Sequence, residues 1–390
     1  MLFLHNHYRQ PGGEDQVFAA EGELLEARGH RVSRYVMHND RAAKMSRAGL
    51  LRTTIWNGAV YRELRALIRR ERPQVAHFHN TFPLISPAAY YAARAEGVPV
   101  VQTLHNYRLL CTNALFFREG RVCEDCLGRK ATWPGVAHAC YRESRASSAA
   151  VAAMLASHRA AGTWSRAVDM YVALTGFARQ KFVQGGLPAE KIATKPNFIE
   201  PDPGTGDGRG GYALFVGRLS REKGVETMLA AWERLRTRVP LKIVGDGPLA
   251  ARVAEVAGRF REVAWLGRQP KDRVLDLMKE ARALIFPSVW YEGFPMVIAE
   301  AYAVGLPVVA SDLGSMSSLI DHGRTGLRFR PGDPEDLAVQ IERISKRPEE
   351  LARMRREARA EFEANYTAER NYEMLLEIYQ AAAGQAEART

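Results

Sequence analysis

The segment PSVWYEGFPMVIAE at residues 287–300 follows the apolar run ALIF at residues 283–286. The apolar run is typical of a buried strand, and the segment after it predicts a loop that leads into a helix. Gly293 permits close backbone approach, and Pro295 suits the first turn of a helix. The first amides of that helix then lie at the positive end of its dipole, which favours binding of an anion such as a phosphate.

Two acidic residues, Glu292 and Glu300, frame the start of this predicted helix. At a rise of about 1.5 Å per residue they lie roughly 10–12 Å apart along the axis, which is about the span from a sugar across a diphosphate to a ribose. Each carboxylate could accept hydrogen bonds from hydroxyl groups at one end of such a ligand. The alternative is a surface helix that carries two unrelated acids.

Length and composition limit the classes of protein that the sequence can encode. The chain has 390 residues and 46% hydrophobic content, which favours two domains over one. No apolar run approaches the roughly 18 residues of a membrane span, and the first residues do not resemble a signal peptide, so we expect a cytoplasmic protein. The net charge of +11 indicates nucleotide phosphates, an acidic membrane surface or nucleic acid as partners, although solvation alone could also explain it.

The N-terminal half alternates strand and helix patterns. We predict a first strand at residues 2–4, a helix at 14–28, a second strand at 30–36 and an arginine-rich helix at 50–72 that contains Trp56 and Tyr61. This last helix is either an ordinary solvated helix or a peripheral contact with the inner face of an anionic membrane.

Two further strands in this half end in polar residues. The first ends at His79 and Asn80, and the second is followed by His105. In a doubly wound parallel sheet, ligands gather at the carboxyl ends of the strands, so these residues are expected at a cleft. A satisfied structural histidine is the alternative for each ring.

The four cysteines of the chain lie close together in the sequence. Their spacing is Cys-x11-Cys-x2-Cys-x13-Cys, and the residues are Cys111, Cys123, Cys126 and Cys140. Four thiolates with one close pair could hold a structural zinc ion that orders a loop-rich insertion. Four thiols without a ligand and a redox function are the alternatives, whereas disulfides do not suit a reducing cytoplasm.

A second strand and helix series follows a linker rich in glycine and proline at residues 200–211. Its first strand, at residues 212–216, leads into Arg218 and Lys223, which could point into one crevice and neutralise a leaving diphosphate. Two later strands end in glycine turns at Gly245 and Gly267. Each of these motifs is weak by itself, and two solvated cations remain an alternative for Arg218 and Lys223.

The order of these motifs, with Glu-x7-Glu inside Pro-Ser-x-x-x-Glu-Gly-Phe-Pro, resembles the donor site of retaining glycosyltransferases of the GT-B class, family 4. The Gly-Arg-x5-Lys-Gly pattern of that family is matched except that four residues separate Arg218 from Lys223. The resemblance implies an α/β fold of two Rossmann-like, doubly wound parallel-sheet domains that face a cleft. The domains would be residues 1–199, with the cysteine-containing insertion at about 106–146, and residues 212–366, followed by a helix at 367–390 that crosses back to the first domain.

The resemblance also implies roles for individual residues. Glu292 would hold hydroxyls of the donor sugar, Glu300 the ribose, and Arg268 with the turns at Gly245 and Gly267 the nucleobase. His105 would lie near the donor sugar, whereas His79 and Asn80 would lie nearer the acceptor. The implied catalytic set is Glu292, His105, Arg218 and Lys223, and the implied donor-binding set is Gly12, Gly13, Gly245, Arg268, Gly293, Phe294, Met296, Val297 and Glu300.

The implied reaction is retaining transfer of a sugar from a nucleoside diphosphate sugar to a hydroxyl of a glycan or lipid-linked acceptor. The sequence holds no Asp-x-Asp metal motif, which agrees with catalysis that requires no metal. A sugar-nucleotide epimerase of the same fold and a non-catalytic nucleotide- or nucleic-acid-binding protein are the alternatives. No recognisable nucleic-acid motif is present, and a glycoside hydrolase would need its two acids to face each other across a bond.

Overall fold

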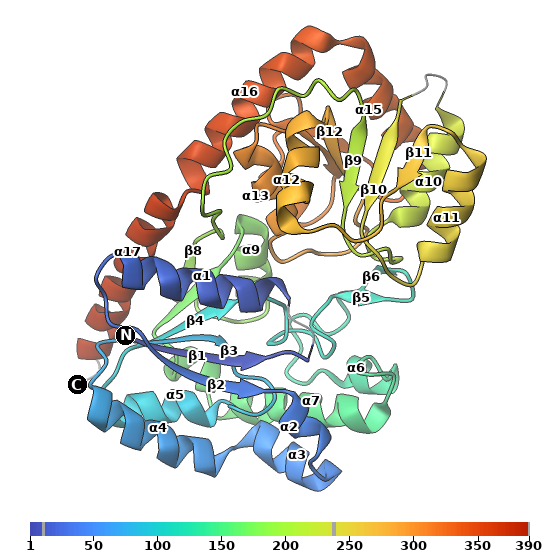
Figure 1. Cartoon of the computed structure of the whole chain (residues 1–390). Coiled ribbons are helices and arrows are strands. Elements are labelled where there is room, and N and C mark those ends of the chain that lie inside the picture. Colours follow the sequence, from blue (N-terminus) through green and yellow to red (C-terminus); the bar gives the residue numbers. More distant parts are fainter. Residues whose placement is uncertain (10–11, 236–238, 389–390) are drawn as a thin grey trace. The chain divides into compact units, whose positions relative to one another are not determined.

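The computed structural model describes residues 1–9, 12–235 and 239–388 of the chain. It consists of two compact units (Figure 1). The first comprises Met1–Phe116, Glu124–Pro196 and Asn371–Thr390, and the second comprises Phe117–Cys123 and Asn197–Arg370. Within the described ranges, no helix combines the length and the apolar character that crossing a membrane requires.

The first unit is built on six parallel strands in the order β2-β1-β3-β4-β7-β8. The sheet grows in both directions from β1, so the carboxyl ends of β1 and β3 form the switch point where open α/β sheets bind ligands. Strands β3, β4 and β7 are buried along their whole length, as inner strands covered on both faces must be. The strands are β1 (Leu2–His7), β2 (Ser33–His38), β3 (Ala76–Asn80), β4 (Val100–Leu104), β7 (Met170–Ala173) and β8 (Ile192–Thr194).

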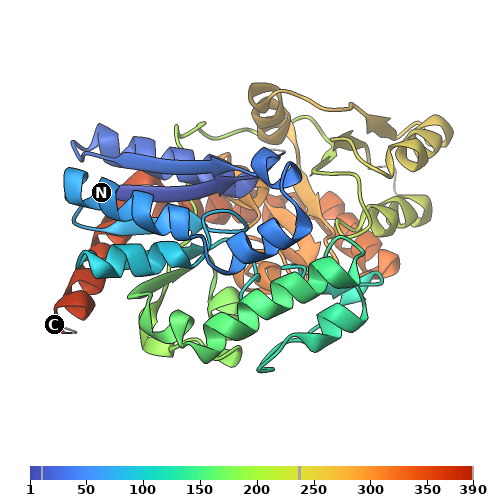
Figure 2. The same ribbon diagram turned by 90° about the horizontal axis from the view of Figure 1, so that it is seen from below.

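Helices cover both faces of this sheet. Apolar residues of α1 and α17 pack against the sheet on one face, and the C-terminal helix α17 contributes Leu375, Ile378 and Tyr379 to that core. Helices α3 and α7 lie side by side on the other face (Figures 1 and 2). The helices are α1 (Gly13–Ala27), α2 (Asp40–Ala43), α3 (Arg47–Ile55), α4 (Gly58–Glu71), α5 (Ala88–Ala95), α6 (Trp133–Ala137), α7 (Arg145–Ala160), α8 (Thr163–Arg166), α9 (Gly176–Gln184) and α17 (Ala368–Glu387), with a 3₁₀ turn at Ala189–Lys191.

Two elements differ from their predictions. The second strand was expected at residues 30–36 but runs over Ser33–His38, where half-exposed and exposed residues alternate because β2 is an edge strand without a buried run to mark its bounds. The helix expected at residues 50–72 is two helices, α3 and α4. The chain breaks at Asn57, whose side chain accepts hydrogen bonds from the first amides of α4 and thereby starts a new helix.

The second unit has six parallel strands in the order β11-β10-β9-β12-β13-β14. Numbered by their appearance in the unit, this is the order 3-2-1-4-5-6 of dinucleotide-binding folds, with its switch point between β9 and β12. The strands are β9 (Ala213–Val216), β10 (Leu241–Val244), β11 (Val263–Trp265), β12 (Ala283–Phe286), β13 (Val308–Ser311) and β14 (Gly326–Phe329). The helices are α10 (Val225–Arg234), α11 (Ala250–Arg259), α12 (Lys271–Glu280), α13 (Met296–Ala303), α14 (Ser315–Leu319), α15 (Pro334–Lys346) and α16 (Pro348–Asn365).

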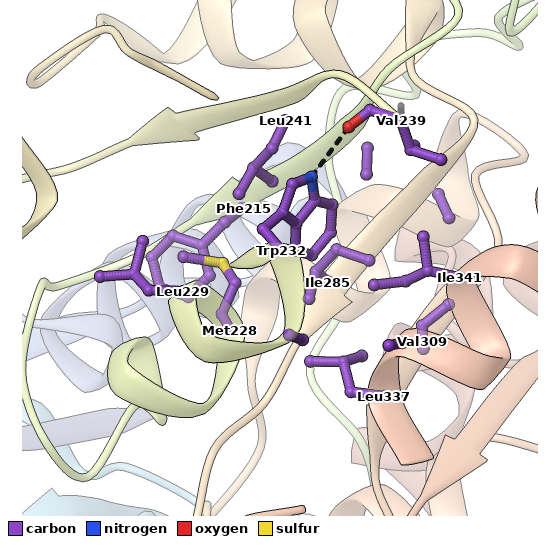
Figure 3. Packing of buried hydrophobic residues seen from close by; sticks show 14 of the residues in the cluster. Phe215, Met228, Leu229, Trp232, Val239, Leu241, Ile285, Val309, Leu337 and Ile341 are labelled. Carbon is purple, nitrogen blue, oxygen red and sulfur yellow. Dashed lines mark hydrogen bonds between the residues drawn. The ribbon is translucent and has the colours of Figure 1, made fainter. Parts of the chain in front are cut away.

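Apolar cores on the two faces of the second sheet hold its loops in place. On one face, Trp232 of α10 fills the space between the sheet and α15, and its indole N–H donates to the carbonyl oxygen of Val239 at 2.8 Å (Figure 3). The hydrogen bond satisfies the only polar atom of a buried indole. The labelled neighbours in this core are Phe215, Met228, Leu229, Leu241, Ile285, Val309, Leu337 and Ile341.

Two irregular segments connect these elements. The predicted linker at residues 200–211 contains neither helix nor strand, and its amides at Gly206, Gly208 and Gly210 donate to carbonyl groups of the second unit. These hydrogen bonds hold it against that unit. The segment between β4 and α7 holds the four cysteines, helix α6 and a short antiparallel hairpin of β5 (Phe117–Arg118) and β6 (Arg121–Val122).

Candidate active site

The central feature of the second unit is an ion pair at its switch point. The Nζ atom of Lys223, after β9, lies 2.7 Å from Oε1 of Glu292, after β12. The same oxygen accepts hydrogen bonds from Ser288 Oγ at 2.7 Å and Trp290 Nε1 at 2.8 Å. Glu292 is only 5% exposed, so its charge is satisfied by these protein donors. Lys223 is thus bonded to a carboxylate beside the space expected to hold a diphosphate.

A glycine allows the two loops to come this close. Gly224 has a φ of +68°, and a Cβ atom at this position would lie 1.8 Å from the carbonyl oxygen of Pro287. Only glycine fits such a contact without a shift of the backbone. The amide of Val289 then donates to the carbonyl oxygen of Glu222 at 2.9 Å. The Lys223–Glu292 pair therefore rests on backbone contacts between the two loops.

The turn that leads into α13 is held by a serine. Ser315 Oγ of α14 donates to the carbonyl oxygens of Glu292 and Gly293 at 2.7 and 3.1 Å. Helix α13 begins at Met296, and Pro295 is its N-cap residue rather than a member of its first turn. The amides of Met296 and Val297 thus belong to the helix start, where N–H groups have no partner within the helix.

Glu300 lies within α13 and is half-buried. Burial raises the pKa of its carboxyl group, and the nearby positive charge of Lys271 opposes this change. A half-buried carboxylate of this kind gains from a hydroxyl donor, because a hydrogen bond to the charged form offsets its desolvation.

Three glycine turns meet at the ends of β9, β10 and β11. A Cβ atom on Gly245 would lie 1.9 Å from the carbonyl oxygen of Gly217, and the φ of Gly245 is +135°. The amide of Gly245 donates to the carbonyl oxygen of Gly267 at 2.8 Å, and Trp265 Nε1 donates to that of Gly245 at 3.0 Å. These contacts hold the glycine turns close together at the strand ends.

Arg218 and Arg268 are both exposed at this edge of the sheet. Arg268 Nε lies 3.5 Å from Asp246 Oδ2, but its side chain is 82% exposed, so the contact adds little to stability. Both guanidinium groups can therefore turn toward a ligand without breaking a contact that stabilises the fold.

A chain of buried polar groups lies at the switch point of the first unit. His79 Nδ1 lies 3.0 Å from His105 Nε2, and His79 Nε2 lies 3.5 Å from Glu21 Oε2. Glu21 Oε1 in turn accepts a hydrogen bond of 2.6 Å from Lys195, and both side chains are fully buried. The chain connects a charged pair under the sheet with His105 at the carboxyl end of β4.

The two histidines of this row of buried groups, His79 and His105, are neutral at physiological pH. Burial lowers the pKa of His105 to about 3, with further lowering by the charges of His5 and Lys195. Burial also holds the pKa of His79 well below its usual value. His105 can therefore accept or donate a hydrogen bond to a sugar hydroxyl, but it is not a cation or a general acid near pH 7.

The glycine pair of the first unit is coupled to an aspartate. Gly12 is the N-cap residue of α1, and its amide donates to Asp15 Oδ2 at 2.7 Å. The other carboxylate oxygen of Asp15 lies 2.9 Å from both His5 Nε2 and His7 Nδ1. Burial opposes ionisation, but these hydrogen bonds outweigh it and hold the pKa of Asp15 at about 2. The amide of Gly12 thus already has a carboxylate partner, whereas Gly13 begins the helix.

Glu14 lies beside this cluster and faces the other loops of the switch point. Its Oε2 atom accepts a hydrogen bond from Asn106 Nδ2 at 3.2 Å. Its Oε1 atom is buried and has no hydrogen-bond partner among the described residues. Burial raises the pKa of Glu14 to about 7, against the lowering effect of hydrogen bonds from Tyr8 and Asn106 and of the charge of Arg108.

Asn80 shapes the chain after β3. Its Nδ2 atom donates to the carbonyl oxygen of Asn6 at 2.8 Å, and its Oδ1 atom accepts from the amide of Phe82 at 2.9 Å. Both ends of the amide are therefore occupied by backbone groups. The side chain of Asn80 therefore stabilises the backbone after β3, in the part of the first unit where the sequence predicts the acceptor.

Two groups of side chains could hold a metal ion within the described ranges: His5, His7 and Asp15, and Glu21, His77 and His79. In the second group, the Lys195 ammonium already binds Glu21, and both ring nitrogens of His77 have partners in Tyr379 and Thr103. That group therefore fits an ion pair better than a metal. Cys111 and Cys126 are buried, and Cys123 and Cys140 are half-buried. The four thiols, all among the described residues, form no such group, so the structure does not bring the predicted zinc ligands together.

Comparisons with known proteins agree with this architecture. Residues 11–203 match the model described as Glycosyltransferase Family 4, and residues 203–361 match the model described as Glycosyl transferases group 1. HepE of Anabaena, solved in complex with UDP, superposes with a TM-score of 0.68 at 18% identity over 97% of this chain and 99% of its own. The chain is a group 1 glycosyltransferase of the GT-B fold.

Two curated relatives extend the comparison of this glycosyltransferase. A glycogen synthase of Mycobacterium tuberculosis is 27% identical over 323 residues, which cover 80% of this chain and 70% of the relative. A D-rhamnosyltransferase of Pseudomonas aeruginosa, WbpZ, is 32% identical over 161 residues, which cover 40% of this chain and 42% of the relative.

Several site residues of the glycosyltransferase were not predicted from its sequence. Ser288 and Trp290 lie inside the segment that was recognised, but no local pattern shows that both bind one carboxylate oxygen. Glu14 and Asp15 directly follow the glycine pair, and this adjacency was an available signal. Glu21 and Lys195 are separated by 174 positions, so only the fold reveals them as partners.

Proposed function

We propose that this glycosyltransferase moves a sugar from a nucleoside diphosphate sugar to a hydroxyl of a glycan or lipid-linked acceptor, in cell-surface polysaccharide synthesis. The Lys223–Glu292 pair at a nucleotide-binding switch point carries the proposal, because it places a cation and a carboxylate directly before the start of α13. A cation suits the leaving diphosphate, and a carboxylate suits sugar hydroxyls. Anabaena HepE has been solved with UDP-glucose, which supports the same class of donor here.

The chemistry follows from how charge develops. Cleavage of the bond between sugar and phosphate leaves negative charge on the diphosphate, and Lys223, Arg218 and the amides at the start of α13 would stabilise it. The acceptor hydroxyl would attack from the same face, and its proton would pass to the leaving phosphate, which gives retention of anomeric configuration. His105, as a neutral ring, would orient the donor sugar through a hydrogen bond.

Thermal stabilisation by UDP, GDP, ADP and their sugar conjugates tests the proposed donor class. A ligand that binds only the folded protein raises the melting temperature, by an amount that grows with its concentration relative to Kd. We expect a selective rise with one nucleotide and its sugar conjugate. If every nucleotide leaves the melting temperature unchanged at millimolar concentration, the chain is not an enzyme that uses such donors.

We predict that Arg218→Ala weakens nucleoside diphosphate binding by about 10-fold or more, because one charge-assisted contact contributes roughly 1.5–3 kcal/mol. Because the side chain of Arg218 is exposed and is not part of the packed core, the free energy of unfolding should change little. Titration calorimetry of Arg218→Ala and of the control Arg221→Ala, an exposed neighbour in the same loop, measures the difference. Equal affinities in the two variants would remove Arg218 from the donor site.

We also predict a pH dependence that originates at Glu14. Because its pKa is about 7, the ionised fraction falls about tenfold for each pH unit below that value. The charged carboxylate is a stronger hydrogen-bond acceptor for the attacking hydroxyl than the protonated acid, so the rate falls with it. The rate of donor hydrolysis, with water as the acceptor, should decline at acid pH in the natural protein and in the control Glu23→Gln. In Glu14→Gln this acid limb should disappear, and an unaltered limb would contradict the role.

The four cysteines are kept as a proposed structural zinc site, although these described residues form no metal-holding group in this structure, so binding would require the insertion to rearrange. Metal analysis of freshly purified, reduced protein should find about one zinc ion per chain, since four thiolates saturate a tetrahedral ion. Replacement of Cys126 by serine should release the metal and lower the melting temperature. Protein that is folded and active with no zinc would leave the cysteines as plain thiols.

A further inference from the structure

A cavity of about 300 Å³ lies between α3 and α7 of the first unit, outside the residues assigned to the donor. Leu50 and Leu51 of α3 and Ala150 and Val151 of α7 form its apolar wall. At roughly 30 Å³ for a water-sized group, it has room for about ten carbon atoms. Such an apolar wall favours a hydrocarbon rather than a polar ligand.

Aromatic and cationic side chains form another part of the cavity lining or lie directly against it. Phe82 and Tyr141 line the cavity, with ring centroids 5.8 Å apart. The guanidinium carbon of Arg108 lies 4.6 Å from the centre of the Phe82 ring and 4.9 Å from that of Tyr141. Arg142 lines the cavity and stacks on Tyr141 at 5.3 Å.

Within the described ranges, two arginines that line the cavity are not paired with an acid. Arg47 and Arg142, one on each side of the cavity, have no carboxylate partner in the part of the chain that the structure describes. Arg108 donates instead to the carbonyl oxygen of Thr112. Two guanidinium groups in the lining of an apolar cavity, with a third against its aromatic rings, suit an anionic group such as a phosphate.

Hydrogen bonds connect Arg108, which lies against the rings that line the cavity, with the switch point. The amide of Arg108 donates to Asn106 Oδ1 at 3.0 Å, and Asn106 Nδ2 donates to Glu14. The Oε1 atom of Glu14 is buried and has no hydrogen-bond partner among the described residues, so a ligand hydroxyl would bond to it once the groups that cover it move aside. Along this path the first unit presents a hydroxyl acceptor, then guanidinium groups, then an apolar cavity.

We propose that the acceptor is a sugar joined through phosphate to a hydrocarbon chain. Its hydroxyl lies at Glu14, its phosphate at Arg108 and Arg142, and the first part of its chain in the cavity. The inference rests on the proposed transfer function and names the acceptor class of that same site. Leu51 lines the cavity and is 37% exposed. It lies in the stretch for which the sequence offers contact with anionic lipid as one interpretation, so the hydrocarbon chain of the acceptor could enter the cavity from a bilayer.

Farnesyl phosphate, used below its micelle concentration, is the probe for this site, with inorganic phosphate and farnesol as its separate halves. We expect farnesyl phosphate to bind at least tenfold more tightly than either half. Ala150→Phe fills the cavity and should weaken farnesyl phosphate binding at least tenfold. Ala149→Phe, an exposed neighbour on α7 that does not line the cavity, should not.

A second pair of variants keeps the test independent of packing. Arg142→Gln should weaken farnesyl phosphate binding about tenfold but leave farnesol binding unchanged, and Arg145→Gln, also exposed, is its control. Binding of UDP by all variants is measured in parallel, so failure of the donor proposal is seen separately. Equal binding of inorganic and farnesyl phosphate, or unchanged farnesyl phosphate binding by both Ala150→Phe and Arg142→Gln, would overturn the proposal.

Discussion

Replacement of Glu292 by glutamine is expected to lower the rate of sugar transfer by about 10²–10³-fold while leaving nucleoside diphosphate binding nearly intact. The carboxylate balances Lys223 and accepts three hydrogen bonds on one oxygen. An amide of the same shape keeps the packing, but it removes the charge. It also replaces one acceptor oxygen of the carboxylate by an NH₂ group, which only donates hydrogen bonds. The positioned carboxylate for the sugar hydroxyls would be lost.

Nucleotide binding should survive in this variant because Lys223 remains and loses its competing anion. The measurement is the steady-state rate of donor turnover together with the Kd for the nucleoside diphosphate from calorimetry. Glu226→Gln, an exposed acid in the first turn of α10, is the matched control. An equal loss of rate and of nucleotide affinity in Glu292→Gln would show that the residue acts through the fold of the loop instead.

Replacement of Lys195 by methionine is expected to destabilise the first unit by about 3–5 kcal/mol. Glu21 and Lys195 are both 0% exposed, so removal of the ammonium leaves a carboxylate buried without its counter-ion. The urea concentration at half-unfolding should fall sharply relative to that of the control Glu23→Gln. The control changes an exposed acid of α1, the helix that carries Glu21.

A double variant separates the burial of charge from the loss of volume. Glu21→Leu combined with Lys195→Met removes both charges, and buried ion pairs replaced by apolar residues of similar size are often neutral in stability. The double variant should therefore be more stable than Lys195→Met alone. A double variant that is less stable than either single variant would mean that the pair contributes net stabilisation. Donor turnover should still fall, because His79 then loses the acid next to its ring.

The sequence predicted the sheet framework well where strands are buried. Runs such as residues 283–286 have no polar residue, and inner parallel strands require this composition. The edge strand β2 was misplaced because half of its residues remain exposed, and Asn57 was not recognised as a helix cap within an arginine-rich stretch.

The candidate site was predictable where its residues lie in one segment or at strand ends. Glu292 and Lys223 were expected near one ligand, but their direct bond depends on the contact that Gly224 makes with Pro287. Glu21 and Lys195 gave no signal, because a buried charge on a helix and another before a proline look like solvated residues until the sheet brings them together.

Proton NMR of donor turnover tests the central claim of retaining transfer most directly. The nucleoside diphosphate sugar selected by thermal stabilisation, an α-linked hexose conjugate, is incubated with the protein, and the first-formed anomer of the released sugar is recorded before it mutarotates. We predict that the α anomer appears first, with one nucleoside diphosphate released for each sugar. Initial appearance of the β anomer would contradict retention, and release of no sugar from any conjugate that binds would contradict the transfer reaction itself.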